Sequence, residues 1–305
     1  MLVTTAWLHY WIGISVRNIV KILSVFFRFD VSPGGLTQAW ANLAMILKPQ
    51  YDNIGKIIQN TAYLHIDETG WRLSGKTFWL WCFATSKWCY YIIDQSRGSP
   101  VIKKVLGKIF DGILICDFWG AYNKMTALAK QRCFYHLFTE LAKVDKSNTS
   151  DDWKAFRKKL VRLLKDAINL SLKKSDLPET TFEQRKMRLL IRLDAVIASP
   201  RDDKDVNRII KRLIRHRDEM FTFLDFDNIS PYNNFAEQQI RRPAISRKIS
   251  QQNRSDRGAQ AHAIFMTLFK SADLQGLNPV DSIILEAKAQ LEGKAGMPVP
   301  FDRAA

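Results

Sequence analysis

The chain has 305 residues, of which 47% are hydrophobic, so it can bury a full core and is expected to contain more than one structural unit. Its 46 Lys and Arg outnumber its 30 Asp and Glu, and the net charge of +16 favours a nucleic-acid partner over an anionic membrane, because the basic residues are interspersed with acidic ones. The four cysteines form no CxxC pair, which argues against a disulfide framework and fits a reducing cytoplasm.

Residues 1–60 are expected to form a helical segment. The apolar stretch over residues 1–29 is interrupted by charged side chains and is predicted to form buried helices rather than a signal or a membrane span. Helical spacing of apolar residues predicts one helix from residue 16 and a second over LTQAWANLAMIL, with VSPGG between them. The pair fits a helix-turn-helix DNA reader or an ordinary helical hairpin; Gly34 and Gly35 would weaken a recognition helix and favour the hairpin.

The sequence pattern of residues 61–142 predicts the first part of an α/β core. Short β-rich runs predict strands over AYLHID, TFWLWCFAT, KWCYYIID and GILICDFWG, with a helix over PVIKKVLGKIF before the last of them. A short helix over AYNKMTALA and a fifth strand over QRCFYHL complete this region. A hairpin turn is expected at Ser74 and Gly75. The order of these elements predicts a mixed sheet with flanking helices.

The remainder of the chain is predicted to be helical. Residues 143–228 contain long charged stretches with an amphipathic period, which predict a helical insertion. Residues 229–292 enter a helix through ISPYNNFAEQQIRRPAI and add an apolar helix near residues 259–274. Residues 293–305 are rich in Gly and Pro and are expected to form a loose tail.

Two aspartates follow apolar runs in similar ways. Asp67 ends AYLHI and Asp117 ends GILIC, so neighbouring parallel strands would bring both carboxylates to one edge of the sheet, where they could share a metal ion. The alternative is that each aspartate only begins a turn. In an extended strand Glu68 points away from Asp67, whereas His65 shares its face, so Glu68 is a poor second ligand.

A third carboxylate, Glu237, lies on the predicted helix over NNFAEQQIRRP. Glu237 and Arg241 are four residues apart and could form a helix-surface ion pair. The setting favours contact with phosphate instead, because a cluster of basic residues follows. The candidate DNA-binding residues are Arg241, Arg242, Arg247, Lys248, Arg254 and Arg257.

Five segments, HIDETGWR, ICDFWGAYN, QRCFYHL, NNFAEQQIRRP and RKIS, occur in an order that resembles the insertion sequence 66 family of DDE transposases. The resemblance covers roughly residues 41–279. It implies a ribonuclease H-like fold in which Asp67, Asp117 and Glu237 are the three catalytic acidic residues and hold two Mg²⁺ or Mn²⁺ ions. It also implies metal-dependent strand cleavage and strand transfer at insertion-sequence ends.

The resemblance further implies DNA partners, both transposon ends and target, and a homo-oligomer assembled on that DNA. Accessory proteins from the same element and a cytoplasmic location at the bacterial nucleoid are expected on the same ground.

Cys133 and His136 form a single Cys-x-x-His pair, too few ligands for zinc. By resemblance, His136 is an accessory residue near the active site, with packing in the core as the alternative. Trp119, two residues beyond Asp117, is a candidate contact for a DNA end.

Two rival functions remain open at this point. The chain begins at an apolar Met1 without the longer amino-terminal segments that the family usually carries, so a truncated copy or a catalytically inactive DNA-binding remnant is an alternative. A glycoside hydrolase using Asp67 and Glu237 as acid and base is the other, although the charge of +16 does not suit a neutral sugar.

Overall fold

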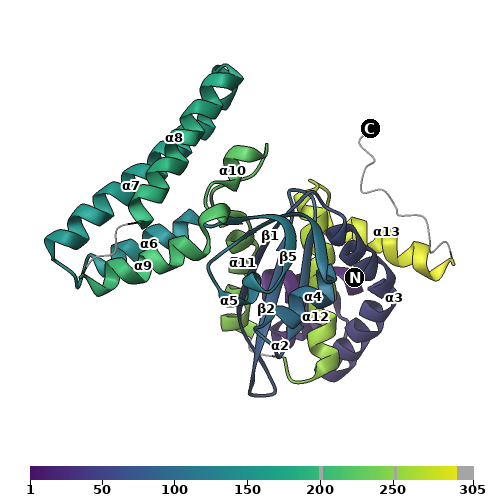
Figure 1. Cartoon of the computed structure of the whole chain (residues 1–305). Helices are drawn as coiled ribbons and strands as arrows, with labels where there is room; N and C mark the ends of the chain where they lie inside the picture. The colour runs from purple at the N-terminus through teal and green to yellow at the C-terminus, as the bar shows by residue number, and fades with distance from the viewer. Residues whose placement is uncertain (199–201, 251–252, 294–305) are drawn as a thin grey trace. The chain divides into compact units, whose positions relative to one another are not determined.

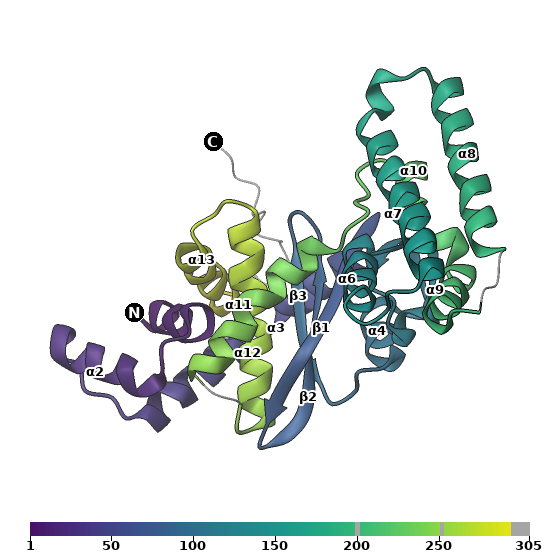
Figure 2. The same cartoon turned by 90° about the vertical axis from the view of Figure 1, so that its left-hand side faces the viewer.

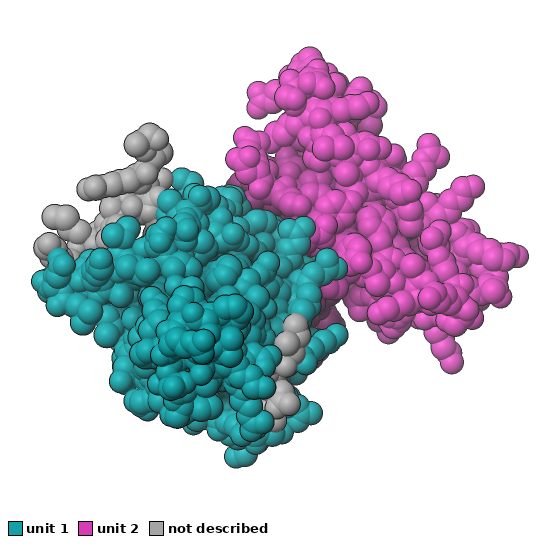
Figure 3. Space-filling model, turned by 180° about the vertical axis from the view of Figure 1, so that it is seen from behind, with its two compact units in different colours: residues 1–112, 120–126, 235–305 teal, residues 113–119, 127–234 magenta. Residues whose placement is uncertain are grey.

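The computed structural model describes residues 1–198, 202–250 and 253–293 (Figure 1). The expected tail therefore lies, from residue 294 onward, outside the described residues. Two compact units divide the chain: unit 1 comprises residues 1–112, 120–126 and 235–305, and unit 2 comprises residues 113–119 and 127–234 (Figure 3).

A five-stranded sheet confirms the expected mixed α/β class. Its strands are β1 (Tyr63–Leu73), β2 (Lys76–Ala84), β3 (Cys89–Asp94), β4 (Ile109–Cys116) and β5 (Thr126–Arg132), in the spatial order β3-β2-β1-β4-β5. The pairs β1–β2 and β2–β3 are antiparallel. The chain passes from unit 1 to unit 2 within β4, after Gly112.

The turn between β1 and β2 is the predicted hairpin. Leu73 pairs with Lys76, so Ser74 and Gly75 alone form the turn, and both have positive φ, 49° and 78°. Two left-handed residues in a two-residue loop match the twist of antiparallel strands. The strand β1 thus continues six residues beyond Asp67, and the expectation that a strand ends at Asp67 is wrong.

Unit 1 also contains helices. They are α1 (Leu2–Ala6), a π-helical turn (Trp7–Ile12), α2 (Val16–Phe27), α3 (Pro33–Gln59), α4 (Ser99–Leu106), α5 (Gly120–Asn123), α11 (Asn234–Ser250), α12 (Asp256–Leu274) and α13 (Pro279–Leu291). Of these, α11 and α12 lie beside the strands in Figure 2. The buried helix α12 packs beside β3, where Thr267 Oγ1 accepts from the Tyr91 N–H at 2.9 Å and Ser271 Oγ accepts from the Cys89 N–H at 3.1 Å. These hydroxyls satisfy the backbone donors of an edge strand.

The amino-terminal helices confirm the expected helical segment, with one difference. Ile19 and Leu23 of α2 are buried, but the end of the helix is not: Val25, Phe26 and Phe27 are 61%, 77% and 65% exposed. The prediction of buried helices is wrong for this end of α2, although Phe26 and Phe27 follow the buried Ile19 and Leu23 at helical spacing. Within the described part of the chain, no helix has both the length and the apolarity to cross a bilayer.

Unit 2 is mainly helical. Its helices are α6 (Phe134–Val144), α7 (Asp151–Leu172), α8 (Glu179–Ile197), α9 (Lys204–Arg215) and α10 (Thr222–Asp225), and α7 and α8 lie side by side (Figures 1 and 2). Ser150 and Asp203 cap α7 and α9 by accepting backbone N–H bonds at 3.1 Å and 2.9 Å. Apolar side chains of α7, α8 and α9 form the interior of this unit.

The fifth strand differs from its prediction. The strand β5 covers Thr126–Arg132, most of which was expected to be helical, and the helix α6 begins at Phe134, inside the predicted strand QRCFYHL. Ala127, Leu128 and Ala129 favour helices by propensity but lie in the edge strand of the sheet, because strand pairing overrides local propensity. The end of β5 is buried although it is polar. Gln131 is fully buried because its side chain donates to the Met220 carbonyl at 3.1 Å and accepts from the Phe223 N–H at 3.0 Å.

Candidate active site and its basic surroundings

Asp67 lies in the middle of β1, half-buried, opposite Cys82 of β2. Residues paired across antiparallel strands point to the same face of a sheet. Cys82 belongs to a buried cluster that includes Ile240 of α11 and Met266 of α12. The side chain of Asp67 therefore points to the face of β1 that α11 and α12 cover.

Other residues of β1 confirm this orientation. His65, two residues before Asp67, packs against Phe235 of α11 with ring centroids 5.5 Å apart. Glu68 points to the opposite face, as predicted, where Arg97 Nε donates to it at 3.0 Å and Tyr122 Oη donates at 2.5 Å. Glu68 is thereby committed to a buried ion pair, away from the face of Asp67.

Glu237 lies in the first turn of α11 and is half-buried. The helix is fixed against the strands by Ala236 and Ile240, which are buried, and by Tyr91, whose Oη donates to the Gln239 carbonyl at 2.9 Å. Since Phe235 contacts His65, the first turn of α11 lies over the part of β1 that carries Asp67. Within unit 1, the structure brings Asp67 and Glu237 to the same face of β1.

Asp117 belongs to unit 2 and is the first residue after β4, which confirms its predicted position at a strand end. Its Oδ1 accepts from the Trp119 N–H at 2.7 Å, and this short turn leaves the tryptophan 41% exposed. Its backbone carbonyl accepts from Arg132 Nη1 at 2.6 Å. The carboxylate is half-buried.

A buried network of charged side chains contacts the backbone of Asp117. The fully buried guanidinium of Arg132 donates through Nε to Glu219 at 2.6 Å, and His216 Nδ1 is 2.8 Å from the same carboxylate oxygen. Burial alone would raise the pKa of Glu219, but the bond with His216 and the charges of Arg132 and Lys130 outweigh it and lower the pKa to about 2. Glu219 is therefore ionised at neutral pH and holds Arg132 against the Asp117 carbonyl.

The predicted accessory residues line one groove of unit 2. Asp117, Trp119 and His136 border a hollow of about 640 Å³, together with Arg208 and Arg212 of α9. His136 lies in the first turn of α6 rather than on a strand. The Cys133 sulfur accepts from the Asn233 N–H at 3.1 Å, a contact within the core of unit 2.

The Transposase IS66 family matches residues 1–261. This chain belongs to that family. A search of curated proteins found no significant match. Membership gives the chain a transposase role, implies DNA as its partner, and removes the ground for the glycoside hydrolase alternative.

In this IS66-family chain, the predicted DNA-binding residues sit on and after α11. Arg241, Arg242, Lys248, Arg254 and Arg257 are exposed, and Arg247 is half-buried with its guanidinium over Gly70 of β1. Two of them are also bound within unit 1: Arg242 lies over the ring of Trp11 at 4.8 Å, and Arg257 donates to Gln38 and Asn42. The other exposed residues of the cluster are available to phosphate.

Sequence reasoning missed two features of this IS66-family chain. Arg132 and Glu219 are separated by 87 residues, so no local pattern connects them. The second feature, a row of basic residues on α9, did have a signal, because Lys204, Arg208, Lys211 and Arg215 recur at intervals of four, three and four residues, the spacing of one helix face.

Proposed function

We propose that this chain cuts DNA at insertion-sequence ends and transfers the freed strand to target DNA, with Asp67, Asp117 and Glu237 as its catalytic carboxylates. The observation that supports this most is the position of Asp67 on the face of β1 covered by α11, because α11 carries Glu237 in its first turn. Asp117 would contribute the third carboxylate from the turn after β4.

Two Mg²⁺ or Mn²⁺ ions fit these residues. Hard divalent ions take one or two carboxylates each and complete their coordination with water and phosphate oxygens. All three side chains are half-buried, which leaves room for such further ligands. When bound, ions of this kind polarise the scissile phosphate and stabilise the attacking and leaving oxygens of an in-line displacement.

The remaining residues would act on the DNA rather than on the ions. The cluster from Arg241 to Arg257 directly follows Glu237 on the chain and would contact backbone phosphates. Trp119, exposed beside Asp117, would stack on a base at the DNA end, and His136 would orient a phosphate or a carboxylate. A ribonuclease H-like core interrupted by a helical insertion at residues 143–228, and a homo-oligomer on DNA, belong to the same proposal.

The test is strand cleavage of a labelled duplex taken from the DNA that flanks this gene, with Mg²⁺ or with EDTA. Asp67→Asn, Asp117→Asn and Glu237→Gln should each lower the cleavage rate by about 100-fold or more, because each removes a ligand charge at the reacting phosphate. DNA affinity, measured by fluorescence anisotropy, should stay within about two-fold, since base and phosphate contacts come from other residues.

Asp111→Asn is the matched control, because Asp111 is an exposed aspartate on the same strand that leads to Asp117. It should cleave like the wild type. Cleavage by Glu237→Gln at the wild-type rate would refute the assignment. Tight DNA binding by the wild type without metal-dependent cleavage would instead support the inactive DNA-binding remnant.

A further inference from the structure

The helix α9 has two chemically distinct faces. Val206, Ile209, Ile210 and Leu213 are buried in unit 2. The opposite face carries Lys204, Arg208, Lys211 and Arg215, all exposed. Five of the twelve residues of α9 are basic and one, Asp205, is acidic. A solvated helix usually intersperses both signs, so this density of one sign calls for an explanation.

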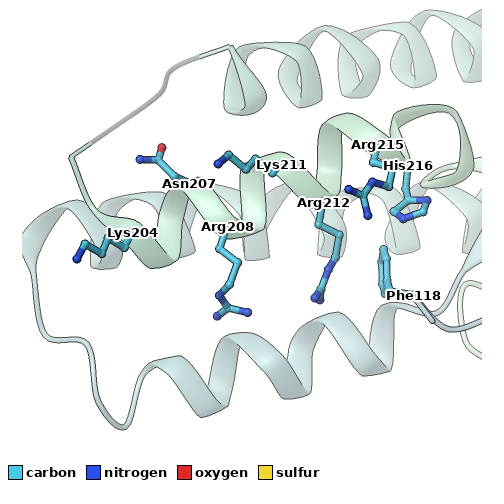
Figure 4. A pocket seen from close by; sticks show the side chains of 8 residues that line it. All are labelled: Phe118, Lys204, Asn207, Arg208, Lys211, Arg212, Arg215 and His216. Carbon is cyan, nitrogen blue, oxygen red and sulfur yellow. The ribbon is translucent and has the colours of Figure 1, made fainter. Parts of the chain in front are cut away.

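These side chains line a groove rather than a flat surface. A hollow of about 520 Å³ is bordered by Lys204, Arg208, Lys211, Arg212 and Arg215 of α9 and by Phe118 at one end (Figure 4). In Figure 4, Arg208 and Arg212 project to the same side of α9, and Arg215, His216 and Phe118 gather at its carboxyl end. A groove lined by cations concentrates the field that attracts a polyanion.

Most of this positive charge is not neutralised within the unit. Glu140 of α6 pairs with both Arg208 and Arg212, and Asp205 is 3.3 Å from Arg208. In the part of the chain that the structure describes, Lys204, Lys211 and Arg215 form no ion pair. At least three exposed cations of one helix face are therefore available to an external anion.

Arg212 shows the electrostatic cost of this arrangement. Burial lowers its pKa, the charge of Asp117 raises it, and the neighbouring charge of Arg215 lowers it again. Its guanidinium lies over the ring of Phe118, 5.3 Å from the centroid. A bound anion would relieve the repulsion between Arg212 and Arg215.

The groove leads to Asp117. Phe118 follows Asp117 in sequence, and Phe118, Arg208 and Arg212 border both this groove and the hollow that contains Asp117 and Trp119. From Lys204 to Arg215, eleven residues of helix span about 16 Å, which is close to five nucleotide steps of one DNA strand at ~3.4 Å each.

We propose that the α9 groove, defined by Lys204, Arg208, Lys211, Arg212, Arg215 and Phe118, binds the phosphate backbone of the donor DNA next to the bond that is cut. The inference rests on the proposed function for the location of the cut, but the binding itself does not require catalysis. The contacts are with phosphate and are therefore independent of base sequence.

The test compares Lys211→Gln/Arg215→Gln with Lys158→Gln/Arg162→Gln. Both variants remove one Lys and one Arg four residues apart from exposed helix positions of unit 2, so their net charge is identical. Affinity for a duplex of arbitrary sequence is measured by fluorescence anisotropy between low and moderate salt. Loss of two phosphate contacts should reduce the magnitude of the negative slope of log K against log salt by about 2 in the α9 variant. The slope of the α7 variant should stay near that of the wild type.

A Lys211→Cys protein gives a second readout, because the four natural cysteines are buried. A photoactivatable crosslinker on this thiol should label the end duplex within about five nucleotides of the cleavage site. Equal salt slopes for the α9 and α7 variants would overturn the inference. So would a loss of affinity confined to duplex RNA or to an acidic polypeptide, with DNA binding unchanged.

These results separate the inference from the proposed function. If Asp67→Asn abolishes cleavage but the α9 variant binds DNA like the wild type, the inference fails and the proposed function stands. If the salt slope of the α9 variant falls by about 2 while no carboxylate variant affects cleavage, the groove binds DNA but the catalytic assignment fails.

Discussion

Glu219 links acid pH to the stability of unit 2. Its carboxylate receives bonds from His216 and Arg132, and Arg132 is completely buried. A buried guanidinium without its partner carboxylate is destabilising by several kcal/mol, so the two residues depend on each other.

Lowering the pH should therefore weaken the fold in a defined window. The pKa of Glu219 is about 2 when folded, against 4.5 as its ordinary value. The stabilisation is complete above pH 4.5 and is lost as the pH falls from there towards 2, with a total of about 3 kcal/mol at 1.36 kcal/mol per pH unit. Urea unfolding at a series of pH values between pH 3 and pH 6 measures how the free energy of unfolding falls in this range.

Glu219→Gln should flatten this pH dependence and reduce DNA cleavage, since Arg132 would no longer be fixed against the Asp117 carbonyl. Asp218→Asn is the control, because Asp218 is 88% exposed and pairs only on the surface with Arg217. A Glu219→Gln protein with the same pH profile as the wild type would contradict this role.

At the level of elements, the β1–β2 hairpin sets the register that places Asp67. A slip of one residue would turn Asp67 to the opposite face, where Glu68 now binds Arg97. The turn depends on two residues with positive φ, Ser74 at 49° and Gly75 at 78°.

Gly75→Ala should lower the free energy of unfolding by about 1 kcal/mol, because a Cβ is strained at this φ although nothing lies within 4 Å of it. Gly34→Ala, in the first turn of α3, also meets no atom within 4 Å, but its φ is not positive. That control should be neutral or stabilising by a few tenths of a kcal/mol. Thermal unfolding of both variants measures the difference, and equal effects would disprove the explanation.

Local patterns predicted most elements but not every boundary. The amphipathic periods of α2 and α7, the apolar run of α12 and the hairpin residues were sufficient to place those elements. Local patterns failed at β5 and α6, because Ala127, Leu128 and Ala129, which favour helices, lie instead in an edge strand of the sheet, and strand pairing depends on tertiary contacts that no local pattern shows. The same reason applies to the site: Asp67 and Asp117 could be singled out from their strands, whereas the orientation of Asp67 towards α11 depends on tertiary packing.

For the whole molecule, each unit carries one cluster of basic residues beside a proposed catalytic carboxylate. One follows Glu237 on α11, and the other is the α9 groove. Because each surface releases counterions when it binds phosphate, both should contribute to a steep salt dependence of DNA binding.

Arg241→Gln/Lys248→Gln tests the surface on unit 1. The two residues are exposed and seven positions apart on α11, so they share a helix face. Their removal should weaken binding to all duplex sequences alike and reduce the salt slope by about 2. An unchanged slope, measured beside Lys158→Gln/Arg162→Gln, would mean that this surface serves only solubility.

The discontinuous course of unit 1 has a consequence for biosynthesis. Its strands β1, β2 and β3 are complete by Asp94, but α12, which buries their face and satisfies β3, ends at Leu274. At a translation rate of about 5–20 residues per second, roughly 9–36 s separate the two. Unit 2 is complete at Asn234, before α12 is made, so it can begin to fold while Trp71 and Tyr91 still lack the helices that bury them. The nascent chain is thus expected to require a chaperone on the very strand that carries Asp67.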